Sequence, residues 1–287
     1  ELFISTEVAK GIWVYPNPSL NPENGWSAEL GIKQGVKVGS WMGYLDVAGF
    51  LMQYDDMMEF TFGKWGVHEP DTILGGVNSF NFWGLGFKSI NVGKTQISGL
   101  ELSISGQGKI NKDITINLLA GYTYMNPISL SPDEVYEVTD EPFNLNGEDV
   151  DSLTYTNSSS DPSILKYRYK HLAKIDAELN YKKMSLGGSF RYNDFMSNID
   201  AIFTDKIINE GLGEGPDAIP AAIPGINDAR KNAKDGDVII DARLGYQLND
   251  MIRFGFVVNN LLNREYMSRP ANMMPPRTFA IQLAFKI

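Results

Sequence analysis

Apolar and polar side chains alternate with a period of two along most of this chain. The alternation is clearest at residues 114–124, 238–246, 252–258 and 279–287. Five further segments alternate less regularly, at residues 26–36, 41–55, 90–106, 167–181 and 185–195. Period two places successive side chains on opposite faces of a β-strand. The pattern therefore predicts an all-β protein with about nine strands, each with one apolar and one polar face, and it predicts no helix.

The connections between these segments alternate between short and long. The short ones are 37–40, 109–113, 182–184 and 247–251, and the long ones are 56–89, 126–166, 196–237 and 260–277. Compact soluble domains rarely carry several unstructured loops beyond about 15 residues, whereas outer-membrane barrels combine short periplasmic turns with long extracellular loops. The asymmetry predicts an antiparallel transmembrane β-barrel in which the last strand descends toward the periplasm. Residues 1–25 are then mostly part of an extracellular loop.

The two faces of the predicted strands differ in charge. The charged positions of the polar set are Glu29, Lys33, Glu101, Lys174, Asp176, Glu178, Arg191, Asp241, Arg243 and Arg253. A lysine or arginine facing hydrocarbon at mid-depth would cost roughly 2–4 kcal/mol, so this set is expected to face the lumen and the apolar set the lipid. The alternative is the solvated face of a soluble all-β binding domain, which gives no reason for the loop asymmetry.

Tyrosines stand near the ends of several predicted strands. They are Tyr54, Tyr122, Tyr124, Tyr181, Tyr192 and Tyr246. Amphipathic rings are stable at the headgroup boundary and form aromatic girdles around membrane barrels. Aromatic residues are also ordinary strand formers, so the positions support a girdle without requiring one.

Composition narrows the classes of function. The 287 residues carry a formal net charge of −10, include no cysteine and only two histidines, and have a mean hydropathy of −0.20. No stretch approaches the roughly 18 uninterrupted apolar residues of a membrane helix, and residues 1–7 lack the features of a secretion signal. The acidic balance argues against nucleic-acid binding, and the lack of cysteine excludes thiol catalysis and disulfide scaffolds. No catalytic or phosphate-binding motif is present, so we expect no enzyme activity, no cofactor and no metal site.

The long connections contain the candidate ligand contacts. Trp65, His68, Phe82 and Trp83 lie in the loop at 56–89. Aromatic rings offer a large contact area at low entropic cost, but they could equally pack the loops on one another. In the last loop, Arg269 and Met273 stand beside Met267 and Met274. A methionine pair could bind copper or haem, and hydrophobic packing of the loop is the favoured reading.

An acidic run occupies residues 133–151. It contains eight carboxylates and no lysine or arginine. Oxygen-rich loops can bind calcium, but the spacing of an EF-hand is missing. A solvated acidic loop is the better interpretation.

Four sequence elements resemble TonB-dependent receptors, and their order along the chain is that of the family. They are Asn17-Pro18-Ser19-Leu20-Asn21-Pro22-Glu23 followed by Trp26–Gly31, then Ile97-Ser98-Gly99-Leu100-Glu101, Val258–Tyr266 and Pro275-Pro276-Arg277-Thr278-Phe279. Together they span most of the chain, and their sequences are most similar to Bacteroidetes-type members of the family. One departure is the end, where Phe285 stands two residues before the last position that an aromatic residue commonly occupies in the family.

The resemblance implies a barrel of 22 strands with an N-terminal plug, located in the bacterial outer membrane and energised through TonB. Residues 1–287 would supply about the last nine strands, so the partners would be the remainder of the receptor, TonB through that part, and lipid or lipopolysaccharide. Whether a surface lipoprotein caps the mouth stays open. The charged residues that we expect to contact the plug or one another are Glu101, Arg191, Asp241, Arg243 and Arg253.

The expected function is the import of a scarce small ligand. An iron-siderophore comes first, followed by haem, cobalamin or an oligosaccharide. The alternatives are a passive porin and an outer-membrane adhesin.

Overall fold

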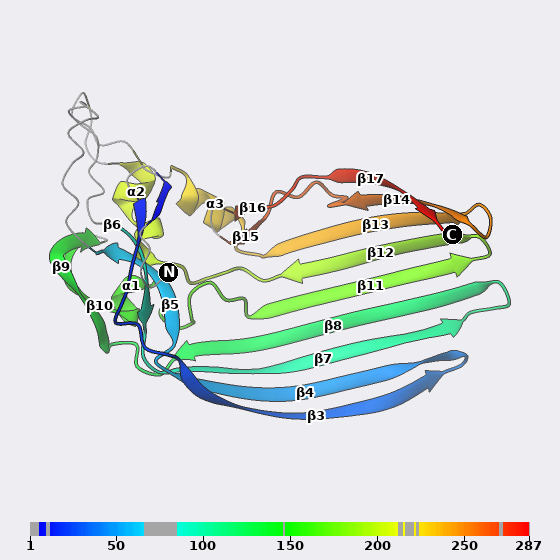
Figure 1. Cartoon of the computed structure of the whole chain (residues 1–287), viewed down its shortest axis with the longest axis horizontal. Helices are drawn as coiled ribbons and strands as arrows, with labels where there is room; N and C mark the ends of the chain where they lie inside the picture. Colours follow the sequence, from blue (N-terminus) through cyan, green and yellow to red (C-terminus); the bar gives the residue numbers. More distant parts are fainter. Residues whose placement is uncertain are drawn as a thin grey trace.

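The chain builds one large antiparallel sheet with small structured elements at one end. The computed structural model describes residues 6–9, 12–65, 85–145, 147–211, 215, 221, 224–269 and 272–286. The sheet has nine strands in the order β17-β14-β13-β12-β11-β8-β7-β4-β3, so the order of the strands across the sheet follows their order along the chain (Figure 1). The strands are β3 (Asn24–Val38), β4 (Trp41–Asp55), β7 (Thr95–Lys109), β8 (Ile114–Ser129), β11 (His171–Tyr181), β12 (Met184–Asn193), β13 (Asp237–Gln247), β14 (Ile252–Asn259) and β17 (Thr278–Phe285).

The nine strands predicted from the alternation are confirmed, with two boundaries wrong. The segment predicted at 90–106 is interrupted at Gly93, whose φ of +79° ends one strand before β7 begins. The segment predicted from residue 167 starts only at His171, because Tyr167 has a φ of +58° and residues 168–170 lie outside the sheet. Positive φ is incompatible with an extended strand, and neither interruption changes the polarity of the alternating pattern.

The long connections are structured, which corrects the prediction of unstructured loops and of a chain without helix. Four short strands form a second sheet in the order β1-β2-β6-β5. These strands are β1 (Thr6–Ala9), β2 (Ile12–Tyr15), β5 (Met58–Lys64) and β6 (Leu85–Asn91). The remaining elements are β9 (Val135–Leu145), β10 (Glu148–Thr154), α1 (Tyr155–Ser158), the 3-10 helix η2 (Ala201–Thr204), α2 (Lys206–Glu210), α3 (Ile226–Asn232), β15 (Met267–Arg269) and β16 (Asn272–Met273). In the part of the chain that the structure describes, no helix is long and apolar enough to cross a membrane.

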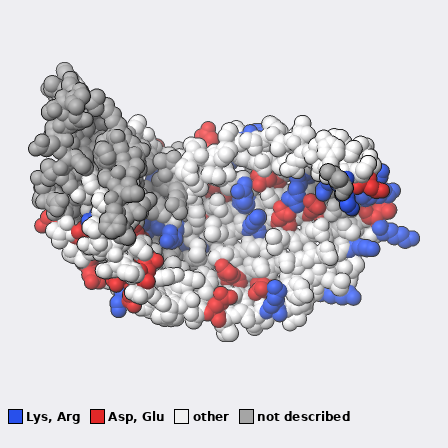
Figure 2. Space-filling model, in the orientation of Figure 1, with Lys and Arg blue, Asp and Glu red and all other residues white. Residues whose placement is uncertain are grey.

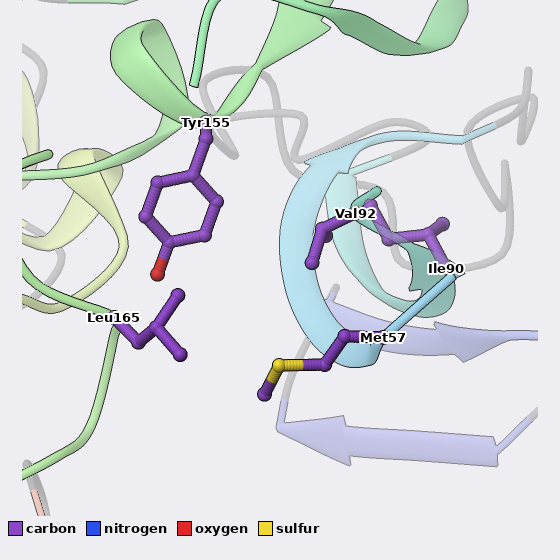
Figure 3. Close-up of a cluster of buried hydrophobic side chains, with 5 residues drawn as sticks. All are labelled: Met57, Ile90, Val92, Tyr155 and Leu165. Atoms are coloured by element: carbon purple, nitrogen blue, oxygen red, sulfur yellow. The ribbon is translucent and has the colours of Figure 1, made fainter. Parts of the chain in front are cut away.

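The elements of the first three long connections gather at one end of the nine-stranded sheet, and we call them the loop assembly (Figure 1). It buries a core of its own, in which Met57, Ile90 and Val92 face Tyr155 and Leu165 (Figure 3). A second buried cluster joins Phe62 of β5 to Ala201, Ile202 and Ile208. Burial of these side chains stabilises the folded connections, although most of their strands and helices are too short for a clear periodic signal.

Strand pairing separates a charged face of the large sheet from an apolar face. Cross-strand partners share a face, and the pairs Lys33–Asp46, Ala48–Glu101 and Asp176–Ser189 connect strands from β3 to β12 on the charged face. All ten charged positions expected on a single face lie on it: Glu29, Lys33, Glu101, Lys174, Asp176, Glu178, Arg191, Asp241, Arg243 and Arg253. Figure 2 shows acidic and basic side chains spread over the strands.

The opposite face is apolar and open. Leu30 and Ile281, on the two edge strands, expose 84% and 82% of their surfaces, and Leu102, Leu186 and Phe256 on the strands between them expose 43%, 59% and 41%. An apolar surface of this extent marks a contact with lipid or with a protein partner.

Aromatic side chains border the apolar face at both ends. Near the loop assembly, Tyr122 and Tyr192 lie beside Ala173 of β11, and near the hairpin turns Tyr181 ends the same strand. The eight residue steps from Ala173 to Tyr181 correspond to about 26 Å along the strand, or about 20 Å along the axis of a barrel at the usual strand tilt. This spacing is close to the apolar band of an outer-membrane barrel. Tyr54 is an exception to the predicted girdle, because it packs against the loop core from the charged face.

Candidate functional site

A buried ion pair joins two long connections inside the loop assembly. Lys166 ends one connection and Asp200 begins the helical part of the next, with 2.9 Å between Lys166 Nζ and Asp200 Oδ1. Their side chains are 1% and 2% exposed. Lys166 Nζ also donates to Ser158 Oγ at 3.0 Å and lies 5.4 Å from the centre of the Tyr155 ring. Burial of two opposite charges requires this kind of close geometry with additional hydrogen bonds.

Tyrosine hydroxyls extend the ion pair into a hydrogen-bonded network. Tyr167 donates to Asp200 Oδ2 at 2.6 Å, and Tyr136 donates to Ser158 Oγ at 2.6 Å. Tyr155 accepts from the backbone N–H of Lys166 at 2.5 Å and donates to Glu59 of β5 at 3.3 Å. The network therefore connects three long connections at a single point.

The electrostatics of this network hold its lysine charged and its tyrosines neutral. Burial alone would lower the pKa of Lys166, but the adjacent Asp200 carboxylate raises it above its ordinary value. Burial raises the pKa of Tyr155, and Glu59 raises it further. Burial raises the pKa of Glu59 to about 7, against the opposing influence of Lys166. Glu59 Oε2 is buried and has no hydrogen-bond partner among the described residues.

Sequence reasoning missed this network. Lys166 and Asp200 are 34 residues apart in polar connections, where a lysine and an aspartate read as solvated surface. The only sequence signal is the clustering of Tyr155, Tyr167 and Tyr169 around Lys166, which is unusual for a solvated loop.

Trp65 is the aromatic ligand candidate that the structure describes in the connection at 56–89. It follows β5 and is half-buried, its Nε1 donates to the carbonyl oxygen of Gly86 at 3.1 Å, and Lys88 Nζ lies 5.0 Å from its ring centre. Lys88 is also paired with Glu137 of β9 at 3.2 Å. The other candidates of this connection lie outside the described residues: His68, Phe82 and Trp83.

The last long connection is organised by Asn260, whose φ is +51°. Its side chain donates to the carbonyl oxygens of Arg264 and Pro275 at 2.8 and 3.3 Å and accepts from the Arg264 N–H at 2.8 Å. Beyond it, the hairpin of β15 and β16 pairs Met267 with Met273, and both methionines are exposed. Arg269 lies in β15, so the structure places Arg269 and Met273 in one hairpin, whereas Trp65 follows β5 of another sheet.

On the charged face of the large sheet, Arg243 of β13 reaches across β12 to the acidic residues of β11. Its guanidinium donates to Asp176 at 2.7 and 2.8 Å and to Glu178 at 3.1 Å. Gly187 of β12 lies directly beneath, and a methyl group there would collide with the guanidinium. The bidentate contact is the strong form of an arginine–carboxylate pair.

Other charged residues of this face also bind side chains on other strands. Arg253 of β14 donates to Ser185 of β12 at 3.0 Å, and Arg191 is paired with Asp241 at 3.1 Å. Asp241 also accepts from the backbone N–H of Asn260 at 2.8 Å, which joins the face to the last connection. Glu101 is exposed and has no ion-pair partner among the described residues. The structure thus brings Arg191 and Asp241 together and leaves Glu101 apart.

Comparison with known proteins shows to which family the large sheet belongs. Residues 1–261 match the family described as TonB dependent receptor-like, beta-barrel. The chain belongs to this TonB-dependent receptor family. The fold is therefore that of its antiparallel outer-membrane β-barrel, and the resemblance found in the sequence is confirmed. The family is one of receptors and transporters and not of enzymes, and its place is the outer membrane.

Solved structures with the same fold include three receptors and transporters. The ferric-catecholate import receptor Fiu from E. coli K12 is 18% identical with a TM-score of 0.50, and the match covers 94% of this chain and 28% of Fiu. The copper transporter OprC is 13% identical with a TM-score of 0.50, covering 94% and 32%. The outer membrane transporter YddB from Escherichia coli is 14% identical with a TM-score of 0.50, covering 98% and 35%. A search of curated proteins finds no match.

This TonB-dependent receptor chain spans about a third of the length of the solved proteins that it matches. Within the described residues, no group of three or more histidine, cysteine, aspartate or glutamate side chains is arranged to hold a metal ion, and the acidic run forms the β9–β10 hairpin.

Proposed function

We propose that this chain is the wall and mouth of an active importer of a scarce small ligand, energised through TonB. An iron-siderophore is the first candidate, followed by haem, cobalamin or an oligosaccharide. The observation that carries the proposal is the family match over residues 1–261, joined to a loop assembly with its own buried core at one end of the sheet. Fiu, which has the same fold, is a ferric-catecholate import receptor.

In this proposal the charged face lines the lumen and the remainder of the receptor supplies the plug and the other strands of a 22-stranded barrel. Glu101 is the residue best placed to meet a basic group of the plug, because it is exposed on the charged face without an ion pair among the described residues. Arg191, Asp241, Arg243 and Arg253 would support the wall and contact the plug along their exposed edges.

Ligand contacts are proposed for the loop residues Trp65, His68, Phe82, Trp83, Arg269 and Met273. Trp65 is the most useful test position, since its ring already lies beside the cation of Lys88. Aromatic rings with an adjacent cation suit an anionic ligand that itself carries aromatic rings, such as a ferric catecholate complex.

Uptake of a radiolabelled ferric-catecholate complex by cells with and without the complete receptor tests the proposal. We expect uptake that requires both the receptor and TonB and that declines in the Trp65→Ala variant. Trp65→Phe is the matched control, because it keeps an aromatic ring, although a smaller one, and removes the hydrogen bond to Gly86. Uptake that persists without TonB would identify a passive porin, and adhesion without uptake would identify an adhesin; either result refutes the proposal.

A further inference from the structure

The end of the sheet opposite the loop assembly is basic. The hairpin turns and the strand residues beside them carry six lysines against two aspartates, Asp113 and Asp250. The lysines are Lys37, Lys109, Lys112, Lys182, Lys183 and Lys286. All six are exposed, and none has an ion-pair partner in the described part of the chain. Figure 2 shows basic side chains gathered at this end, in a chain whose net charge is −10.

Three neighbouring turns join into one continuous surface. The backbone N–H of Lys182 donates to the carbonyl oxygen of Asp113 at 3.4 Å, which links the β11–β12 turn to the β7–β8 turn. Lys183 accepts from the N–H of Gln247 at 2.8 Å, and its Nζ donates to the carbonyl oxygen of Leu248 at 3.2 Å, which links it to the β13–β14 turn. The backbones of the turns that carry Lys112, Lys182 and Lys183 are therefore linked to one another.

The border of the apolar face lies directly beside these turns. Tyr181 pairs with Met184, which pairs with Tyr246, and all three side chains are exposed on the apolar face. Lys182 Nζ lies 5.2 Å from the centre of the Tyr181 ring, so this cation stands at the boundary between the apolar face and the turns. Tyrosine at the glycerol level with lysine beyond it is the arrangement of a membrane interface.

We propose that the turn surface formed by Lys112, Lys182 and Lys183, with Tyr181 and Tyr246 beside it, binds the phosphate groups of anionic phospholipids in the leaflet that meets the turns. Charge complementarity selects this occupant, because basic residues beside an apolar face favour lipid that is both anionic and membrane-embedded. The site would hold the large sheet at a defined depth in the membrane. It rests on the membrane location of the family and not on the transported ligand, so it can fail while the proposed import stands.

Lipid selectivity of the complete receptor in nanodiscs tests the inference. Association of spin-labelled phosphatidylglycerol is compared with that of spin-labelled phosphatidylcholine at low and high salt. We expect a preference for phosphatidylglycerol that weakens at high salt. Removal of each lysine should lower the preference for phosphatidylglycerol by about fivefold. The Lys182→Gln/Lys183→Gln variant, which removes two lysines, measures the combined loss.

The matched control is the Lys206→Gln/Lys231→Gln variant, which removes two exposed lysines from the loop end and should leave the preference unchanged. Equal association of both lipids with the unmodified receptor would overturn the inference, as would an unchanged preference in the turn variant. Displacement of the labelled lipid by soluble polyglutamate would also overturn it, because the turn surface would then be a docking site for an acidic protein.

Discussion

Removal of one partner from the Lys166–Asp200 pair should open the loop assembly. In the Asp200→Asn variant, the Lys166 ammonium keeps its contact with Ser158 but loses the carboxylate at 2.9 Å, in a position where its side chain is 1% exposed. An unpaired charge at such a site costs about 3–5 kcal/mol. The Tyr167 hydroxyl loses its charged acceptor in the same change, which places the expected effect in the upper half of that range.

Hydrogen exchange of the complete receptor, followed by mass spectrometry, measures this cost. Peptides that cover α1, Lys166 and η2 should exchange at least 100-fold faster in Asp200→Asn, while peptides from β11 to β13 should keep their protection. The Lys166→Met/Asp200→Leu variant is the matched control, since replacement of both charges by apolar groups of similar size is often neutral. Exchange that is unchanged in Asp200→Asn, or equally fast in the control and the single variant, would show that the pair does not hold the connections together.

Three further outcomes follow from the structure. Glu59 has a pKa raised from 4.5 to about 7, so its contribution to the stability of the loop assembly is fully present below pH 4.5 and is lost as the pH rises through 7. We expect a loss of about 1–3 kcal/mol in the free energy of local opening, seen as lower protection factors at pH 8 than at pH 5 after correction for the intrinsic pH dependence of amide exchange, and absent in Glu59→Gln; a pH-independent protection factor in the unmodified receptor would contradict it. Gly187→Ala should displace Arg243 from its carboxylate partners and lower the melting temperature by several degrees, whereas Gly35→Ala, with open space around it, should have little effect; equal shifts would refute the steric argument. Asn260→Ala should cost about 2–3 kcal/mol because three hydrogen bonds of a positive-φ residue are lost, and protease cleavage between β14 and β17 should report it; resistance equal to that of the unmodified receptor would count against this role.

The strands of the large sheet could be predicted from the sequence because their side-chain polarity repeats with the period of a β-strand. Every second residue of β8 or β13 meets the same environment, so the pattern records the face directly. The charged face could be assigned for the same reason, including Glu101 and Arg243. The boundaries were less certain because a single positive φ, as at Gly93, interrupts a strand without disturbing the polarity of its neighbours.

The loop assembly could not be derived from the sequence. Most of its strands and helices have seven residues or fewer, and β9, with 11 residues, does not alternate between apolar and polar side chains, so no window reveals a period. The Lys166–Asp200 pair depends on the approach of segments that are 34 residues apart, and each residue alone resembles a solvated charge. The aromatic composition around Trp65 indicated a structured or ligand-binding loop, but only the fold shows its contact with Gly86 and Lys88.

The placement of Arg243 over Gly187 has a consequence for how the wall assembles. Antiparallel hairpins can pair in shifted registers, and a shift of one residue exchanges the two faces of a strand. A shift of two residues keeps the faces, so the alternating pattern alone does not oppose it. Such a shift of β12 would bring Ser185 or Ser189 beneath the guanidinium in place of Gly187, and their Cβ atoms would force the Arg243 side chain to move. In the observed alignment Arg243 lies over a glycine and reaches Asp176 and Glu178, so these ion pairs favour the native register over a two-residue shift.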